Sequence, residues 1–310
     1  MNEDLTQAVR AALLPGFGVL RIAGQDAVTF LQGQFTNDVR LLAGGRTQVA
    51  ACCTNQGRVI AIVRFRQTED AIYALLPADL LGKLAAHLRK FVLRAKVELL
   101  QAADLQVGAI LTGDAASAEL AHDAFDTAVQ TMSPVPLAGA TEVVTFQYAP
   151  GREVVAAPPA AWRAISGLSF NRTDPRAEAQ WLASDIAAGL PHVFAATSEQ
   201  FTPQMLNVDL LGGVSFTKGC YTGQEIVART HHLGRVKRRT MRYRMAGDGN
   251  LPAPLSNLLL DGAKVADVLM TAATAGGIEL LAVTNLDATG KTLQSADGRA
   301  VEPQPLPYSL

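Results

Sequence analysis

The stretch Lys218-Gly219-Cys220-Tyr221-Thr222-Gly223-Gln224-Glu225, followed by Ile226-Val227-Ala228-Arg229, is the most specific pattern in this sequence of 310 residues. Its first eight residues, the octapeptide 218–225, contain two glycines, which allow turns that a side chain would block. The residue pattern predicts a strand before it, over residues 213–216, and a helix after it, over 225–230. Because a strand–turn–helix junction presents free N–H groups, it favours an anion.

Cys220 and Lys218 are the candidate catalytic residues of the octapeptide. A thiol close to an ammonium group and to free N–H groups is a better nucleophile or ligand than an ordinary cysteine. The alternative is that Cys220 is a small buried residue in a tight turn and that Lys218 is simply solvated. No metal site is predicted. One cysteine alone cannot hold an iron–sulfur cluster. A zinc site of Cys220 with His231 and His232 would lack a second pair of cysteines, so we expect these histidines to be exposed residues at a helix end.

A basic run follows the octapeptide and contains no acidic residue. One interpretation is a positive rim for a polyanion such as RNA or a polyglutamate tail, and the other is the solvated face of a strand. Its cations are Arg229, Arg235, Lys237, Arg238, Arg239, Arg242 and Arg244. Polar and apolar residues alternate from Thr240 to Met245, which predicts a half-buried strand there.

Upstream, the pattern alternates between strands and helices. Strands are predicted over residues 19–22 and 71–76, and a hairpin over 48–53 and 58–65 around Thr54-Asn55-Gln56-Gly57. Asp26 is expected to cap a helix that ends at Gly33, and Pro77 to open another helix.

The second half of the chain repeats strand and helix patterns and then changes to short strands. A strand is predicted over 105–112, an Ala-rich helix from Gly113-Asp114 to about 129, loops around short strands over 133–160, and a helix over 175–188 centred on Trp181. We therefore expect an α+β region over 1–235, made of two αβ units at about 1–103 and 104–235. A β-barrel is expected over 236–310, because turn residues recur there every 8–12 residues or so.

Composition excludes several classes of protein. With 27 Lys and Arg against 28 Asp and Glu, bulk charge cannot hold the chain on nucleic acid. No apolar run reaches the 18 or so residues of a membrane-spanning helix, so no membrane partner is expected. The three cysteines cannot all pair with one another, and we expect free thiols and a cytoplasmic location. The phosphate-binding loop of ATPases, the complete dinucleotide-binding glycine pattern and the serine hydrolase elbow do not occur.

Residues 218–229 resemble the K-G-C-Y-x-G-Q-E-x-x-A-R pattern of the YgfZ family, folate-binding proteins related to the T-protein (aminomethyltransferase) of the glycine cleavage system. Three further stretches are similar to the family's: 24–39, with F-L-Q-G-Q and T-N-D-V; the A-A-G-L-P turn at 187–191; and F-T-P-Q-M-L-N at 201–207. The resemblance extends over about residues 17–240. It implies a T-protein-like folate-binding fold with a C-terminal β-barrel.

The resemblance also implies a ligand, tetrahydrofolate or a one-carbon derivative, in a central pocket. Carboxylate or amide side chains suit the N–H edge of the pterin, cations suit folate carboxylates, and an aromatic face suits the ring. The candidate residues are Glu225 or Gln224 for the edge, Lys218 with Arg229 for the carboxylates, Tyr221 for the ring, and Asn37 and Asp38 near the pocket. We expect Cys220 at the mouth of this pocket, while turn capping is the common alternative for Asn37 and Asp38.

Two departures from the related patterns matter. The acidic pair of the T-protein aligns with Ala61 and Ile62, and loss of such a group costs about 10²–10⁴ in rate, so aminomethyl transfer is not expected. Asp185 stands where many relatives carry arginine, so an anion contact there is either lost or made by another basic residue.

The expected function is that of a tetrahydrofolate-binding accessory protein supporting iron–sulfur cluster assembly or repair and tRNA modification by iron–sulfur enzymes, which would be its partners. The first alternative is a folate-dependent aminomethyl or methyl transferase, which would need another acid, such as Asp38. The second alternative is an RNA-binding module that holds tRNA through the basic run 229–244.

Overall fold

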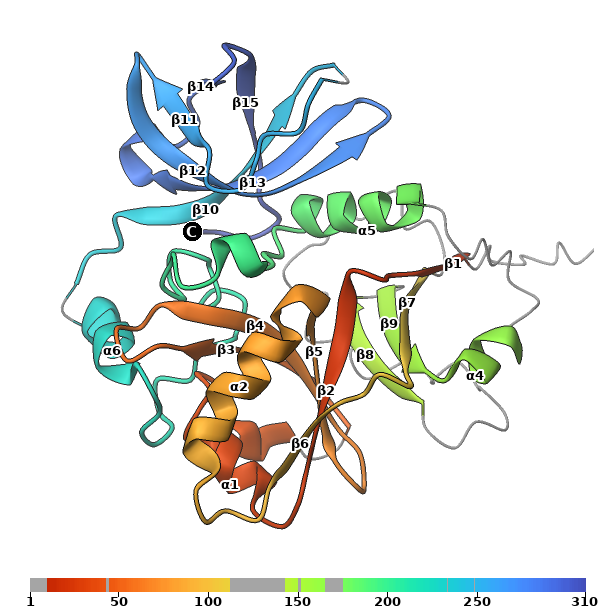
Figure 1. Ribbon diagram of the computed structural model, residues 1–310. Helices are drawn as coiled ribbons and strands as arrows, with labels where there is room; N and C mark the ends of the chain where they lie inside the picture. Colours follow the sequence, from red (N-terminus) through yellow and green to blue (C-terminus); the bar gives the residue numbers. More distant parts are fainter. Residues whose placement is uncertain are drawn as a thin grey trace, which may run out of the picture.

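The computed structural model describes residues 10–42, 45–111, 143–149, 152–164, 175–232, 234–247 and 249–310. Its strands form a five-stranded sheet, a four-stranded sheet and a closed six-stranded barrel (Figure 1). This confirms the predicted α+β class with a C-terminal barrel. Within the described residues, no helix is long and apolar enough to cross a membrane.

The five-stranded antiparallel sheet has the strand order β3-β4-β5-β2-β6. Its strands are β2 (Phe17–Ala23), β3 (Thr47–Cys53), β4 (Val59–Gln67), β5 (Ile72–Pro77) and β6 (Glu98–Gln101). The predicted hairpin is confirmed, since Thr54 donates its N–H to the Arg58 carbonyl at 2.8 Å and Gly57 closes the turn with φ 69°. Most positions of β4 are buried, because both faces of the sheet are covered.

Short helices complete this first layer. They are α1 (Ala27–Gln32), the 3-10 turns η1 (Val39–Leu42) and η2 (Ala78–Leu80), and α2 (Leu81–Val92). Asp26 lies at the N-cap position of α1, but its carboxylate accepts the Lys96 N–H at 2.8 Å and makes no cap hydrogen bond. Pro77 ends β5, so the predicted helix begins four residues later than expected, after η2.

The four-stranded sheet has the order β1-β7-β9-β8. Its strands are β1 (Arg10–Leu13), β7 (Gln106–Leu111), β8 (Val144–Ala149) and β9 (Arg152–Ala157), followed by α4 (Pro159–Ala164). The predicted strand at 105–112 and short strands within 133–160 are therefore confirmed, while the predicted helix up to residue 129 lies outside the described residues. Because β1 pairs with β7, the N-terminal segment contributes to the sheet of the second predicted unit.

The barrel begins at Arg238, close to the boundary predicted at 236. Its strands are β10 (Arg238–Met245), β11 (Asn257–Leu260), β12 (Ala263–Thr274), β13 (Gly277–Asn285), β14 (Leu293–Ser295) and β15 (Ala300–Gln304), with the 3-10 turn η6 (Leu286–Ala288). Met241, Tyr243 and Met245 point into its core, as the alternation in β10 predicts. The helix α5 (Pro175–Ala187), predicted at 175–188, packs between β12 and the sheets (Figure 1).

The segment 213–216, expected to be a strand, is irregular. It is held at single points rather than by a ladder. Ser215 donates its N–H to the Thr36 carbonyl at 2.9 Å, and the Thr36 hydroxyl donates to the Gly213 carbonyl at 2.6 Å. Gly212, at φ 68°, turns the chain immediately before the segment.

The F-T-P-Q-M-L-N segment fastens the barrel to the rest of the chain. The Asn207 side chain donates to the Thr240 carbonyl at 2.8 Å, and the Thr240 hydroxyl donates to the Met205 carbonyl at 2.9 Å. Arg239 forms two hydrogen bonds of 2.9 Å with the Asp209 carboxylate. The start of β10, at residues 239 and 240, is therefore hydrogen-bonded to residues 205–209.

The C-terminal tail returns to the A-A-G-L-P turn. Tyr308 donates its hydroxyl to the Gly189 carbonyl at 2.7 Å and accepts a hydrogen bond from Asn207 at 3.2 Å. Gly189 has φ 65°, and a Cβ there would lie 2.7 Å from the Tyr308 ring, so both the backbone conformation and the close contact require glycine.

We predict that Tyr308→Phe lowers the free energy of unfolding by about 1–2 kcal/mol, because it removes a donor and an acceptor from partly buried partners. Urea denaturation measures the change. Ser309→Ala, at the exposed neighbouring position, is the control and should have no effect. An equal midpoint for Tyr308→Phe and the wild type would show that the tail does not fasten the barrel.

Candidate functional site

Lys218 joins the two most distinctive motifs of the sequence. Its buried ammonium donates to the backbone carbonyls of Gln32, Phe35 and Asn37 at 2.7, 2.7 and 2.8 Å. An ammonium group has three donors, and all three are used here. The alternative of a solvated Lys218 is therefore wrong, and a ligand could bind this ammonium only in place of one of the carbonyls.

Burial governs the electrostatics of this junction. It lowers the pKa of Lys218 to about 8, with the Asp38 carboxylate acting in the opposite direction. Tyr221 is buried beside it, with the ammonium 5.1 Å from its ring centroid, and burial raises the pKa of the Tyr221 hydroxyl. The ring that was expected to hold a pterin thus already contacts Lys218.

The remaining octapeptide residues lie at the surface around the start of α6 (Gln224–His232). Cys220 is a free, exposed thiol, so the alternative of a packed cysteine is wrong. Gln224 is partly exposed, and Glu225 and Arg229 are exposed one turn apart on α6. The three side chains on α6 therefore face solvent rather than an enclosed site.

Asn37 and Asp38 are used in the structure of their own turn. The Asn37 amide donates to the carbonyls of Val49 at 2.8 Å and Gly212 at 2.7 Å, and its oxygen accepts the Asp38 N–H at 2.9 Å. Asp38 forms two hydrogen bonds with the Arg40 guanidinium, which lowers the pKa of the carboxyl to about 2. These contacts match the turn-stabilising alternative for the pair.

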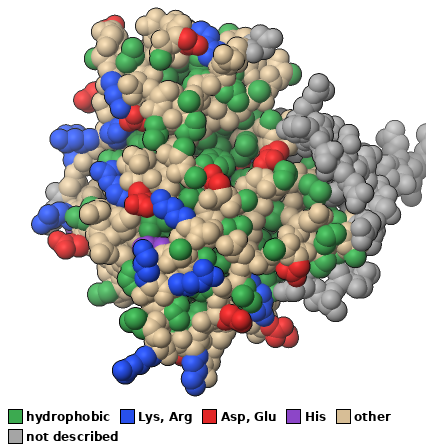
Figure 2. All heavy atoms as spheres, viewed as in Figure 1, with side chains coloured by type: hydrophobic (Ala, Val, Ile, Leu, Met, Phe, Trp, Pro, Cys, Tyr) green, Lys and Arg blue, Asp and Glu red, His purple; other side chains and the backbone are tan. Residues whose placement is uncertain are grey.

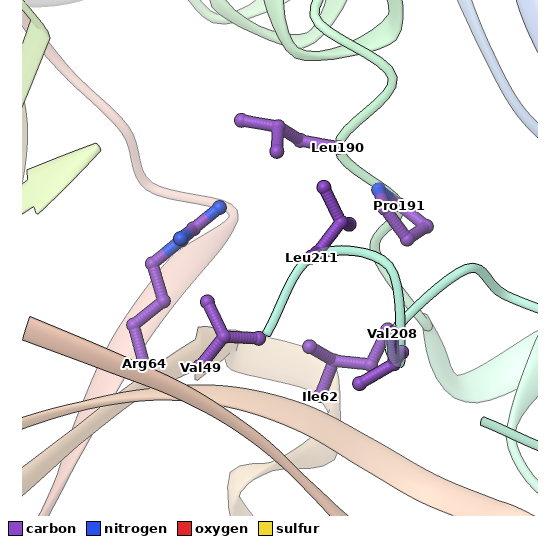
Figure 3. Close-up of a pocket in the computed structure, with 7 residues that line it drawn as sticks. All are labelled: Val49, Ile62, Arg64, Leu190, Pro191, Val208 and Leu211. Atoms are coloured by element: carbon purple, nitrogen blue, oxygen red, sulfur yellow. The ribbon is translucent and has the colours of Figure 1, made fainter. Parts of the chain in front are cut away.

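A small, partly open hollow lies between β4 and the two turns that follow α5 (Figure 3). Its lining is apolar apart from one arginine, and comprises Val49, Ile62, Arg64, Leu190, Pro191, Val208 and Leu211. No octapeptide residue lines it, so the prediction that Cys220 stands at the mouth of the ligand hollow is wrong for this hollow. Ile62, which aligns with an acid of the T-protein, contributes an aliphatic wall.

Arg64 is the polar group of the hollow, and it is only 8% exposed. Its guanidinium lies 3.7 Å from the centroid of the Tyr148 ring, and Figure 3 shows it extending toward Leu190. Among the described residues, no carboxylate forms a salt bridge with it. Burial raises the pKa of the Tyr148 hydroxyl to about 12, so Tyr148 is neutral at ordinary pH and does not neutralise this cation.

Asp185, a carboxylate on which the charge of Arg64 also acts, is fully buried and already has two bonded partners. Its carboxylate forms a salt bridge with Arg152 and a 2.7 Å hydrogen bond with His192 Nε2. Burial opposes ionisation of Asp185, but Arg152 and His192 prevail and lower the pKa of its carboxyl. Arg152 also stacks over Trp181 at 4.4 Å. Position 185, where the family resemblance leads us to expect arginine, is thus acidic, while Arg64 and Arg152 supply cations from β4 and β9, strands of different sheets.

Sequence reasoning missed Arg64, Tyr148 and the hollow. One signal was available, because Arg64 interrupts a run of apolar residues in the predicted strand 58–65. A charge inside a strand that is buried on both faces needs a partner. The partner ring comes from residue 148 of the other sheet, and no local pattern indicates that contact.

The basic run divides into paired and unpaired cations. Arg238, Arg239 and Arg242 form salt bridges with Asp267, Asp209 and Glu279, and Arg244 donates to the Gly276 carbonyl. A positive rim over the whole of 229–244 is therefore wrong, since four of its seven cations have partners on the barrel or beside it.

Comparisons with known proteins show the family of this chain. No family model matches the chain. The chain is 31% identical over 308 residues to the tRNA-modifying protein YgfZ of Yersinia pseudotuberculosis, covering 96% of this chain and 92% of that protein. It is 33% identical over 227 residues to the protein of the same name from Hamiltonella defensa, covering 72% and 66%. The chain belongs to the YgfZ family.

A solved structure extends the comparison to the fold. The glycine cleavage system aminomethyltransferase T from Bartonella henselae superimposes with a TM-score of 0.71 at 16% identity, covering 98% of this chain and 87% of that one. This member of the YgfZ family therefore has the aminomethyltransferase fold. The expected T-protein-like architecture is confirmed.

We predict that Lys218→Met lowers the free energy of unfolding by about 3–5 kcal/mol, because three buried carbonyls lose their donor. Lys218→Arg should also destabilise the protein, since a planar guanidinium cannot aim at the same three oxygens. Urea denaturation checks both. Lys83→Met is the control and should cost less than about 1 kcal/mol, because Lys83 forms a solvent-exposed salt bridge with Glu199. Equal losses for positions 218 and 83 would contradict the anchoring role.

Proposed function

We propose that this protein binds tetrahydrofolate, or a one-carbon derivative of it, in the hollow beside Arg64. With folate bound, it supports tRNA modification by iron–sulfur enzymes in the cytoplasm. Its curated relatives carry the name tRNA-modifying protein, which supports the tRNA part of this proposal. The fold shared with an aminomethyltransferase and the family resemblance support the folate part.

The observation that carries the proposal is the buried guanidinium of Arg64 in an otherwise apolar hollow. A buried cation without a bonded carboxylate is costly, and a ligand that supplies acceptor oxygens removes that cost. A flat ring with carbonyl and carboxylate oxygens fits apolar walls beside a guanidinium donor, and folate has both features.

Folate would supply one-carbon chemistry when bound, and the residues of this chain provide little help for transfer. Ala61 is fully buried, and Ile62 forms a wall of the hollow. Asp38, our example of another acid that could serve a transferase, is paired with Arg40, which lowers the pKa of its carboxyl to about 2, far from that of an efficient general base near neutral pH. The chain therefore suits a folate-dependent accessory role better than a transferase. Turnover of a methylamine donor with tetrahydrofolate would favour the transferase instead.

Cys220 is the group through which we propose contact with the iron–sulfur enzymes. Its thiol is free and exposed beside α6, where another protein can reach it. Lys218, two residues before Cys220, is fixed by three hydrogen bonds to backbone carbonyls, so the loop that carries the thiol is anchored. In this arrangement Lys218 positions the loop, and Cys220 acts as nucleophile or ligand.

We predict that Arg64→Met weakens tetrahydrofolate binding about 10- to 100-fold, because a charged hydrogen bond to the ligand is lost. Isothermal titration calorimetry measures the binding. The ligand-free variant should keep the stability of the wild type within about 1 kcal/mol, since methionine removes an unpaired buried cation while retaining its volume.

Lys83→Met is the matched control for this experiment, because it removes a cation that is remote from the hollow lining. It should bind tetrahydrofolate like the wild type. Undiminished binding by a folded Arg64→Met variant would remove the hollow from the proposal.

We predict that Cys220→Ala retains tetrahydrofolate affinity and stability but lowers the activity of iron–sulfur tRNA-modifying enzymes in cells. An exposed side chain contributes little to folding, so the effect should appear only with partner enzymes. Mass spectrometry of tRNA nucleosides from cells in which the variant replaces the wild type measures it, with Ser309→Ala as control. Full modification in the Cys220→Ala cells would exclude the thiol from the function.

A further inference from the structure

A compact surface lies where α6 ends and the barrel begins. Gly234 donates its N–H to the Arg229 carbonyl at 2.9 Å, which turns the chain back beside the last turn of the helix. The backbone carbonyl of Lys237 accepts a hydrogen bond from the Leu286 N–H at 2.9 Å, which fixes the segment to η6 of the barrel. The α6-end patch defined here consists of Phe216, Arg229, His231, His232, Arg235 and Lys237.

The cations of this patch differ from the rest of the basic run. Arg229, Arg235 and Lys237 are exposed and have no salt bridge among the described residues, whereas the arginines of β10 are bonded to other groups. The nearby acids are Glu225, one turn earlier on α6, and Asp287, next to Leu286. Figure 2 shows Lys and Arg side chains gathered on the side where Figure 1 places α6 and the start of β10. The local excess of positive charge contrasts with the net charge of −1 of the whole chain.

Flat rings lie among these cations. Phe216 and His231 are stacked, with centroids 3.7 Å apart and planes 12° from parallel. His232 stands edge-on to His231 at 4.8 Å. Both histidines are exposed, so this ring cluster is available at the surface instead of filling a core. Phe216 is held in place because Lys218, two residues further along the same loop, is anchored by its hydrogen bond to the Phe35 carbonyl.

We propose that the α6-end patch binds a single-stranded or loop segment of RNA, with phosphates on its three cations and a base stacked on the exposed rings. Basic grooves combined with aromatic stacking are the usual means by which proteins hold unpaired nucleotides. An acidic peptide would satisfy the cations but leave the stacked rings without a role, so RNA is the favoured occupant. The inference rests on the proposed function in one respect: it takes tRNA as the RNA that is present.

The test compares two charge-matched triple variants of the full chain. One replaces Arg229, Arg235 and Lys237 by alanine, and the other replaces Lys90, Arg94 and Lys96, which are exposed cations on α2 and the loop before β6. Fluorescence anisotropy with a labelled, unmodified tRNA transcript is measured over a series of salt concentrations. His231→Ala tests the stack, and circular dichroism and tetrahydrofolate calorimetry verify that each variant is folded.

The patch variant should bind tRNA about tenfold or more weakly than the wild type, with a salt slope less steep by about 2, as three single-strand phosphate contacts require. His231→Ala should weaken binding about 5- to 150-fold with a nearly unchanged slope. The control triple variant should resemble the wild type. Equal weakening by both triple variants, or competition by poly-glutamate with no effect of His231→Ala, would overturn the proposal. Because all variants should still bind tetrahydrofolate, this failure is distinguishable from failure of the proposed function.

Discussion

One ammonium group holds the two signature motifs of this protein together. Lys218 comes from the octapeptide, and its three acceptors come from residues 32–37, more than 180 positions earlier in the chain. The three carbonyls lie between the last residue of α1 and Asn37, and the ammonium group provides each of them with a hydrogen-bond donor. The loop that carries Cys220 and Phe216, the start of α6 and the edge of the first sheet all depend on this one buried contact.

A second group of buried charged residues includes Arg64, which lines the hollow. Around Asp185 the buried charges are balanced, since Arg152 and His192 both contact its carboxylate. Arg64 acts on the same carboxylate without a salt bridge to it, and it stacks on Tyr148 with its guanidinium beside an apolar space. A buried guanidinium that has no salt bridge among the described residues and stands beside an apolar space suits an anionic or oxygen-rich ligand.

The site and the surface patch are separate, yet they share a scaffold. The segment 201–209 contacts β10, α6 and the C-terminal tail, because Gln204 donates to the Val227 carbonyl while Asn207 bonds with Thr240 and Tyr308. Val208, from the same segment, lines the hollow. The segment 201–209 therefore connects the lining of the hollow with α6 and with the start of the barrel.

The sequence by itself determined the class of fold, the barrel, the β3–β4 hairpin and the family, because these depend on local periodicity, turn residues and contiguous motifs. It indicated that residues 218–225 matter, but it assigned Lys218 to chemistry, when the tertiary structure uses all its donors for three distant carbonyls. It predicted a strand at 213–216, where the structure has an irregular segment that two hydrogen bonds with Thr36 hold. Only the tertiary structure decided where the hollow lies and that Arg64 is its polar group, because the ring beneath Arg64 and the acids around it come from other sheets and helices, and such contacts leave no periodic trace in the chain.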